Sequence, residues 1–81
     1  MKVTVLLFAS LREVVGAPQS TLDVEQGANI SDVWHDLAVL YPPLAPHTGT
    51  IAFALNGSYA KPNETVKDGD EIAFLPPVSG G

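Results

Sequence analysis

The residues with the most distinctive chemistry stand at the end of the sequence, which reads Phe-Leu-Pro-Pro-Val-Ser-Gly-Gly. An apolar run stops at Pro76 and Pro77, whose rings fix φ and stiffen the exit of the chain. Gly80 and Gly81 have no Cβ, so the last peptide units could pass through a channel too narrow for a side chain. We therefore predict that residues 76–81 form an extended tail of about 20 Å whose terminal carboxylate is the working group.

This carboxylate would need activation before it could react. A free α-carboxylate has a pKa of about 3.3 to 3.7, so at neutral pH it is ionised and resists nucleophiles. Adenylation by ATP would turn the Gly81 carboxylate into a mixed anhydride, and sulfide donation would then give a thiocarboxylate, a soft nucleophile. The sequence has no glycine-rich phosphate-binding loop. We therefore expect no cofactor bound to this chain and a separate protein that binds the activating ATP.

A second group of residues with ligand chemistry lies in the middle of the chain. Asp32, His35 and Asp36 have the spacing of neighbours on one helix face, where three ligands could meet on a metal ion. Carboxylates and a histidine opposite an apolar stripe are also what an ordinary solvated helix face contains. The other histidine, His47, falls in an expected loop. The sequence therefore predicts no metal site.

Length and composition narrow the classes of function. An 81-residue chain without cysteine predicts one cytoplasmic domain with neither disulfides nor thiolate chemistry. Nine acidic residues against four basic ones give a net charge of −5, which disfavours nucleic acid and favours a partner with a basic docking surface. The longest apolar run, residues 5–9 extended by Val3, is far shorter than the about 20 residues that cross a bilayer, so we expect no membrane partner.

Two helices are predicted from periodicity and capping residues. Residues 30–41 place apolar side chains at three- and four-residue steps, which predicts the main helix, with Ser31 as its N-cap and the following Pro-Pro pair as its stop. Ser10 and Glu13 have the spacing of a capping box, so a short helix is expected to follow the first strand.

Five segments have the composition or alternation of strands: residues 2–9, 20–24, 51–55, 58–60 and 71–75. Residues 42–50 are expected to be a loop. The order of strands around one long helix predicts an α+β fold, a mixed sheet with the main helix on one face, as in the β-grasp. A ferredoxin-like split fold would need a second long helix. The predicted domain spans residues 1–75, and the extended C-terminal tail spans residues 76–81.

Alternation along the first and last strands predicts an apolar surface on the side of the sheet away from the helix. Thr4 and Glu71 mark that solvent side in the two strands. The apolar residues that alternation places beside them are Leu6, Phe8, Ala73 and Leu75. The loop at residues 42–50 could cover them, but exposed apolar clusters usually mark interfaces, so we favour a partner-binding surface.

Residues 6–13 (Leu-Leu-Phe-Ala-Ser-Leu-Arg-Glu) and 68–81 (Asp-Gly-Asp-Glu-Ile-Ala-Phe-Leu-Pro-Pro-Val-Ser-Gly-Gly) resemble the small subunits of molybdopterin synthases, and the resemblance spans the chain. It implies a ubiquitin-like β-grasp fold and a role as sulfur carrier. An E1-like adenylyltransferase and sulfurtransferase would adenylate Gly81 and install sulfur there as a thiocarboxylate, the 1-thioglycine form.

The resemblance also implies how the sulfur is used. The large synthase subunit, in a heterotetramer, would take it to convert cyclic pyranopterin monophosphate into molybdopterin during molybdenum cofactor biosynthesis. Because that subunit would supply the pterin pocket, this chain is expected to donate sulfur without being the catalytic subunit. The working tail is assigned to Val78, Ser79, Gly80 and Gly81. The residues expected at partner contacts are Leu6, Phe8, Arg12, Ala73, Leu75, Pro76 and Pro77.

Three other functions stay open on the sequence. A thiamin-type sulfur carrier also ends in Gly-Gly and is also adenylated. A ubiquitin-like protein modifier would instead have Gly81 joined to lysines of target proteins. A plain interaction module would carry the same tail without using it.

Overall fold

The computed structural model describes residues 1–77 of the 81-residue chain. Its elements follow in the order β1 (Lys2–Leu7), α1 (Ala9–Val15), β2 (Gln19–Asp23), α2 (Ile30–Leu40), the 3-10 helix η1 (Pro42–His47), β3 (Ala52–Leu55), β4 (Ser58–Ala60) and β5 (Glu71–Leu75). No helix in this described part is long and apolar enough to cross a membrane.

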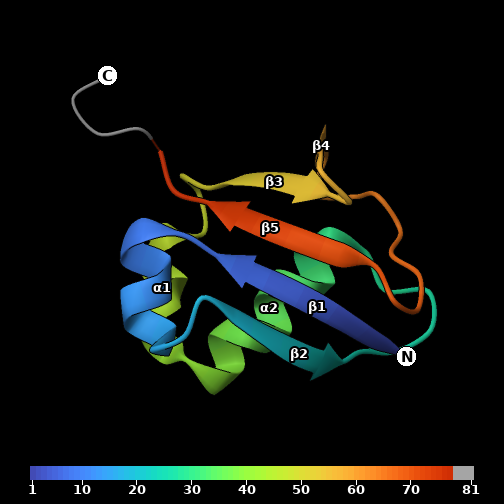
Figure 1. Ribbon diagram of the computed structural model, residues 1–81, viewed down its shortest axis with the longest axis horizontal. Coiled ribbons are helices and arrows are strands. Elements are labelled where there is room, and N and C mark those ends of the chain that lie inside the picture. The colour runs from blue at the N-terminus through green and yellow to red at the C-terminus, as the bar shows by residue number, and fades with distance from the viewer. Residues whose placement is uncertain (78–81) are drawn as a thin grey trace.

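The strands form one mixed sheet in the order β2-β1-β5-β3-β4. Central strands β1 and β5 are parallel, and the other neighbouring strands are antiparallel. In Figure 1, α2 lies behind the sheet, and α1 lies at the end of the sheet where β1 and β5 stop. The prediction of an α+β, ubiquitin-like β-grasp fold with one main helix is confirmed.

The core lies between the inner face of the sheet and α2. Val3, Val5 and Leu7 of β1 alternate inward and are at most 1% exposed. Phe74 of β5 is fully buried, and its ring meets Trp34 edge to face at a centroid distance of 5.0 Å. The remaining fully enclosed side chains are Leu11, Ile30, Val33, Leu37, Leu44, Val66 and Ile72. These residues come from both layers, so the sheet and the helices stabilise each other by burying the same apolar surface.

The N-cap of α2 is Asn29, not Ser31 as predicted. The Asp32 backbone N–H donates to Asn29 Oδ1 at 2.8 Å, and the Asn29 N–H donates to Asp32 Oδ2 at 3.0 Å, which closes a capping box. The prediction was wrong because the apolar stripe already begins inside the helix, at the fully buried Ile30. The cap must therefore precede Ile30.

The turn from β1 to α1 also differs from the prediction. The strand ends at Leu7 rather than residue 9, because Ala9 has a φ of 48°, outside the extended region. Helix α1 begins at Ala9 with Phe8 as N-cap and no side-chain cap, so the predicted capping box of Ser10 and Glu13 is wrong. The Phe8 carbonyl accepts from the Leu11 N–H at 3.1 Å, which turns the chain at once and buries Leu11.

The segment at residues 42–50 is more ordered than the expected loop. Residues 42–47 form η1, whose first-turn prolines suit a helix start and whose Leu44 is fully buried. Helix η1 contacts α1 and α2, so it belongs to the helical layer. The Trp34 Nε1–H donates to Thr48 Oγ1 at 2.9 Å and fixes the end of this segment to α2.

Candidate functional site

Strand register brings the ends of β1 and β5 together. Leu6 pairs with Ala73 across the parallel ladder, and Ala73 pairs with Ala54 of β3. The inward residues of the same strands are buried, whereas Leu6 and Ala73 are only half-buried. Alternation therefore gave the correct face for both residues, and this face points away from α2.

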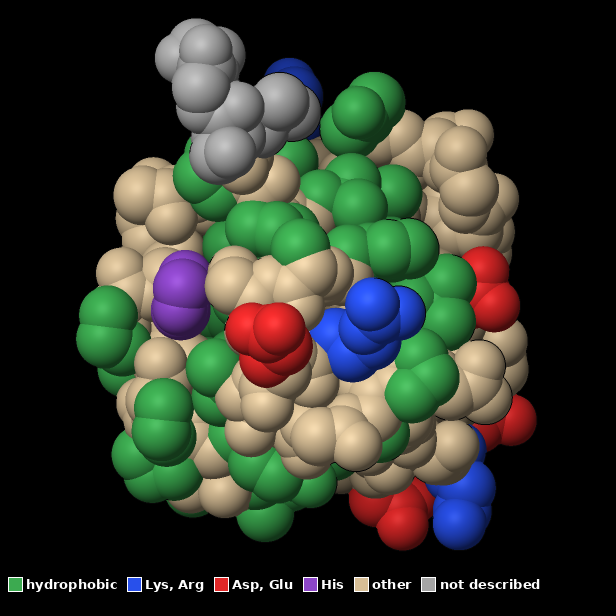
Figure 2. Space-filling model, turned by 60° about the vertical axis from the view of Figure 1, so that its left-hand side comes forward, with side chains coloured by type: hydrophobic (Ala, Val, Ile, Leu, Met, Phe, Trp, Pro, Cys, Tyr) green, Lys and Arg blue, Asp and Glu red, His purple; other side chains and the backbone are tan. Residues whose placement is uncertain are grey.

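An open groove lies at this end of the molecule, at the point where β5 leaves the sheet. Its volume is about 720 Å³. The residues that line it are Phe8, Ala9, Ser10, Thr50, Ala52, Tyr59, Leu75, Pro76 and Pro77. Phe8 is 44% exposed, a large fraction for a phenylalanine. Figure 2 looks toward the α1 end of the molecule and shows hydrophobic side chains gathered there. We call these nine lining residues the tail-root groove.

Tyr59 belongs to the groove, although the sequence did not single it out. It is 83% exposed and pairs with Ala54, so it shares the outward face with Leu6 and Ala73. The signal was present in the Asn56-Gly57 turn, because a two-residue hairpin fixes the register of the strand that follows. Counting from that turn would have placed Tyr59 on the outward face.

The loop at residues 42–50 does not cover the apolar face, contrary to the alternative considered above. Helix η1 packs against the helices instead, and only Thr50 of this segment lines the groove. Arg12, the remaining predicted contact residue, lies in the last turn of α1 and is exposed. The structure thus brings Phe8, Leu75 and the two prolines together, and their contact with a partner stays a prediction.

The predicted tail residues Val78, Ser79, Gly80 and Gly81 lie outside the described residues. Strand β5 ends at Leu75, and Pro76 and Pro77 continue along the groove. The boundary between a domain at residues 1–75 and a tail at residues 76–81 therefore stays a prediction.

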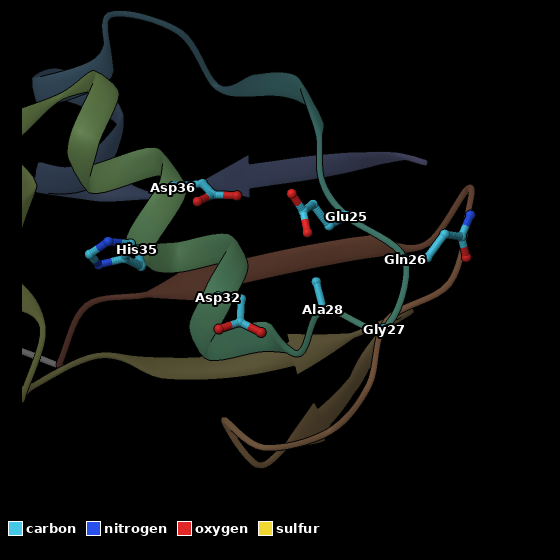
Figure 3. Close-up of a pocket in the computed structure, with 7 residues that line it drawn as sticks. All are labelled: Glu25, Gln26, Gly27, Ala28, Asp32, His35 and Asp36. Carbon is cyan, nitrogen blue, oxygen red and sulfur yellow. The ribbon is translucent and has the colours of Figure 1, made fainter.

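The polar face of α2 holds the other candidate residues. A pocket of about 400 Å³ there is lined by Glu25, Gln26, Gly27, Ala28, Asp32, His35 and Asp36. Figure 3 shows that the side chains of Asp32, His35 and Asp36 point in different directions: the His35 ring points away from Glu25, whereas the Asp36 carboxylate points toward it. Asp32 already accepts the Asn29 N–H in the helix cap. Within residues 1–77, no group of three such side chains has the arrangement of a metal site.

A carboxylate network closes the opposite end of β5. Asp70 accepts from Asn56 Nδ2 at 3.0 Å and from the Lys67 N–H at 2.7 Å. The Asn56 side-chain hydrogen bond, followed by the Lys67 backbone hydrogen bond, lowers the pKa of Asp70 below its usual value of 3.8. Asn56 also accepts from the Glu71 N–H at 2.9 Å. This network fastens the β3–β4 hairpin to the start of β5, at the end of that strand opposite Leu75.

Known proteins resemble this chain along its whole length. A "Molybdopterin synthase sulfur carrier subunit" of Chlamydomonas reinhardtii is 41% identical over 83 residues, with 100% of both chains covered. The crystal structure of the small archaeal modifier protein 1 of Haloferax volcanii superposes with a TM-score of 0.87 at 32% identity and covers 100% of both chains. One chain in a complex of subunits 1 and 2 of the molybdopterin-converting factor from Helicobacter pylori gives a TM-score of 0.69 at 27% identity, again over 100% of both chains.

The model of the ThiS family matches residues 5–81, which include the second half of β1, the tail-root groove and the Gly-Gly end. A match of this extent, together with relatives that are at least 30% identical over the full chain, is sufficient evidence of membership in the family. The chain belongs to the ThiS family.

Proposed function

We propose that this chain is the sulfur-carrier subunit of a molybdopterin synthase. The observation that carries the proposal is the exposed apolar groove at the root of the tail, in a chain of the ThiS family. The 41% identical relative from Chlamydomonas reinhardtii, which bears that function in its name, supports the same conclusion.

The partner at the groove is the large synthase subunit. The complex of subunits 1 and 2 from Helicobacter pylori supports this choice. One chain of that complex agrees with this chain in fold and over its whole length. Phe8, Tyr59 and Leu75 offer apolar area at the groove, and aromatic residues dominate the affinity of many interfaces. Arg12, exposed in the last turn of α1, is assigned as a charged contact with the same partner. We expect the two subunits to assemble as a heterotetramer.

The chemistry is assigned to the carboxylate of Gly81. An E1-like enzyme joins this carboxylate to the AMP moiety of ATP and releases pyrophosphate. A sulfur donor then displaces AMP, so that a C–S bond replaces the C–O bond of the adenylate. The sulfur of the resulting thiocarboxylate bonds to a carbon of cyclic pyranopterin monophosphate in the pocket of the large subunit, and water then cleaves the Gly81 C–S bond, which returns the carboxylate. This chain therefore carries the reactive group, and the partner orients it towards the acceptor.

A ubiquitin-like protein modifier is the second candidate function. The TM-score of 0.87 against a protein named as an archaeal modifier favours it, since both roles begin with an activated C-terminal glycine. A thiamin-type sulfur carrier shares the activation step as well. The fold does not separate these three roles, because their difference lies in the acceptor of the activated carboxyl group.

Reconstitution separates them. The chain is incubated with an E1-like enzyme, ATP and a sulfur donor, and then with the large subunit and cyclic pyranopterin monophosphate. Molybdopterin formed only when all components are present supports the proposal. Transfer of Gly81 to lysines of added proteins, detected as Gly-Gly remnants on digested peptides, would support the modifier role instead. Sulfur passed only to a thiamin thiazole precursor would assign the chain to the other carrier class.

A further inference from the structure

The hairpin turn between β3 and β4 is an Asn-Gly pair. Asn56 and Gly57 are both exposed, and apart from the chain neighbours no described atom lies within 4 Å of the place where a Cβ at Gly57 would stand. Water and hydroxide therefore reach the peptide bond between the two residues, and no side chain at Gly57 hinders them. Asparagine is among the chemically labile residues of proteins, and its chemistry meets the least hindrance beside a glycine.

The chemistry of such a pair is loss of the side-chain amide. Hydroxide removes the proton of the Gly57 backbone N–H, and the nitrogen attacks Cγ of Asn56. A C–N bond forms, the Cγ–Nδ2 bond breaks, and Nδ2 leaves as ammonia after it takes a proton from water, which restores the hydroxide. A further water molecule then opens the cyclic imide at one of its two carbonyl carbons, so Asn56 becomes aspartate or isoaspartate.

The fold holds the Asn56 amide at both ends. Its Oδ1 accepts from the Glu71 N–H at 2.9 Å, and its Nδ2 donates to Asp70 Oδ1 at 3.0 Å. We call these two groups, the Asp70 carboxylate and the Glu71 N–H, the Asn56 clamp. Ring closure must bring Cγ to bonding distance of the Gly57 nitrogen, and the amide cannot swing there while both of its ends stay hydrogen-bonded.

The clamp is itself fixed. Asp70 Oδ2 accepts from the Lys67 N–H at 2.7 Å, and the Asp70 N–H donates to the Lys67 carbonyl at 3.0 Å. The Asn56 N–H donates to the Glu71 carbonyl at 2.8 Å, so the turn is held by its backbone as well. Glu71 begins β5, and the next residue of that strand, Ile72, is fully buried. The clamp therefore opens by a local movement of the hairpin away from β5.

We propose that Asn56 is a modification site, converted to aspartate or isoaspartate when the Asn56 clamp opens, and that the conversion prevents the clamp from closing again. In the aspartate product a carboxylate oxygen takes the place of Nδ2, which stands 3.0 Å from Asp70 Oδ1. Two like charges then repel where a hydrogen bond stood before. Isoaspartate adds a carbon to the backbone of a two-residue turn, whose length sets the register of β4. The site thus records irreversibly that the hairpin has opened.

Peptide mass spectrometry of chains kept in mildly alkaline buffer measures the conversion. The folded chain should convert at least about 30-fold more slowly than the same chain unfolded in urea, because two hydrogen bonds must break first. Asp70→Ala removes one of them and should raise the rate in the folded state by about 3- to 10-fold. In urea the two chains should convert at equal rates, since no clamp exists there. Equal rates for the folded and unfolded chain, or no change on Asp70→Ala, would overturn the proposal.

Val5→Ala separates local opening from global unfolding. Val5 is fully buried in β1 and lies outside the clamp, so its truncation should lower the stability of the whole fold by more than Asp70→Ala does. The conversion rate should nevertheless rise less than it does for Asp70→Ala. A larger rise for Val5→Ala would mean that the reaction needs global unfolding, and the clamp would have no role.

The unchanged chain gives the same distinction if Val5→Ala does not fold. Its conversion rate is measured at increasing urea concentrations below the unfolding transition. A nearly constant rate supports local opening, because opening of the hairpin exposes little surface. A steep increase with urea would show that the reaction proceeds through the unfolded chain, and it would overturn the role of the clamp.

Asn56→Asp reproduces one product and tests whether the clamp stays open. At neutral pH its unfolding equilibrium constant should exceed that of the unchanged chain by about 3- to 30-fold, because repulsion replaces a hydrogen bond. The groups that face the new carboxylate are Asp70 and the Glu71 N–H, with Lys67 beside Asp70. The difference should narrow as the pH falls, because one shared proton removes the repulsion between the two carboxylates.

The control is the same substitution in the Asp70→Asn background, where the second carboxylate is missing. There the difference between the chains with and without Asn56→Asp should not narrow as the pH falls. If Asn56→Asp leaves stability unchanged at neutral pH, or if its effect is independent of pH with Asp70 in place, conversion does not open the clamp and that half of the proposal is wrong.

Discussion

The polar face of α2 and the apolar end of the sheet both hold residues that could form a site, yet only one of them brings its residues together. Asp32, His35 and Asp36 have the spacing of metal ligands, but their side chains diverge and one of them already caps the helix. Phe8 and Leu75 are far apart in sequence and line one groove. Strand register therefore predicted which side chains meet in one site better than helical spacing did.

The reason lies in how each region is fixed. The ends of β1 and β5 are held by a hydrogen-bonded parallel ladder, which sets the relative position of every outward side chain. The polar side chains of α2 extend into solvent. Among residues 1–77, Asp32 is the one of them whose side chain has a hydrogen-bond partner, the cap residue Asn29. A set of side chains on a solvated helix face keeps its rotamer freedom unless a ligand or a packed neighbour restrains it.

The largest expected effect separates two adjacent residues of β5. Phe74→Ala should lower the free energy of unfolding by about 3 to 5 kcal/mol, because it leaves a cavity beside Trp34 and Phe53. Leu75→Ala should change stability far less and should instead weaken binding to the large subunit. Urea unfolding and calorimetry measure the two quantities. If Phe74→Ala does not fold, Phe74→Leu takes its place. It should also lower the free energy of unfolding more than Leu75→Ala does, but by less than Phe74→Ala would. Equal stability losses at both positions would contradict the division between core and interface.

Charge substitutions test the two faces directly. Phe8→Glu and Leu75→Glu should each weaken binding to the large subunit by at least about 30-fold, because a carboxylate would be buried in an apolar contact. The control is Asp36→Lys on α2, which changes the charge by two units rather than one and should still leave affinity unchanged. Calorimetry measures the affinity of the groove variants and of the control, after circular dichroism has shown that each variant is folded. A larger loss for Asp36→Lys than for Phe8→Glu would move the interface to the helix face.

The smallest expected effect concerns the network at the other end of β5. The folded state lowers the pKa of Asp70, so the ionised carboxylate stabilises the fold above the unfolded-state pKa. This contribution is lost as the pH falls through the folded-state pKa, below 3.8. Asp70→Asn should therefore cost less than about 1 kcal/mol at neutral pH, since the group is partly exposed, and nothing in strong acid.

Urea unfolding of both chains from neutral pH into acid checks this pH dependence. The two stabilities should converge as the pH falls. A difference that stays constant with pH would show that the ionisation of Asp70 is not its source. Binding to the large subunit should be unchanged, because Asp70 lies at the end of β5 opposite the tail-root groove.

The sequence predicted the sheet and the main helix because their side chains carry clear periodicity. Inward residues such as Val5 and Ile72 are buried, and Leu6 and Ala73 share the outward face as alternation requires. The Asn56-Gly57 turn was recognised because both residues need a positive φ, which the structure shows.

The errors lie where tertiary contacts override local signals. Ser10 and Glu13 match a capping box, yet the buried Leu7 and Leu11 force the chain to turn earlier, at Ala9. Residues 42–47 were predicted to be a loop because of their prolines. They form η1 instead, and this helix buries Leu44 completely. Tyr59 was missed because its neighbours in β4 are too few for an alternation pattern, although the turn fixes its register. The contacts of Leu11 and Leu44 cannot be read from local sequence alone, whereas Tyr59 could have been placed by counting from the turn.

The central claim is that Gly81 carries sulfur, and intact-mass spectrometry tests it most directly. The chain is incubated with an E1-like enzyme, ATP and a sulfur donor, and the product is then fragmented. We predict a gain equal to one oxygen-to-sulfur exchange, localised to Gly81, because the chain contains no cysteine that could hold the sulfur instead. The label should be lost to cyclic pyranopterin monophosphate only when the large subunit is present. An unmodified Gly81, with the enzyme shown to be active on its own carrier, would contradict the sulfur-carrier function.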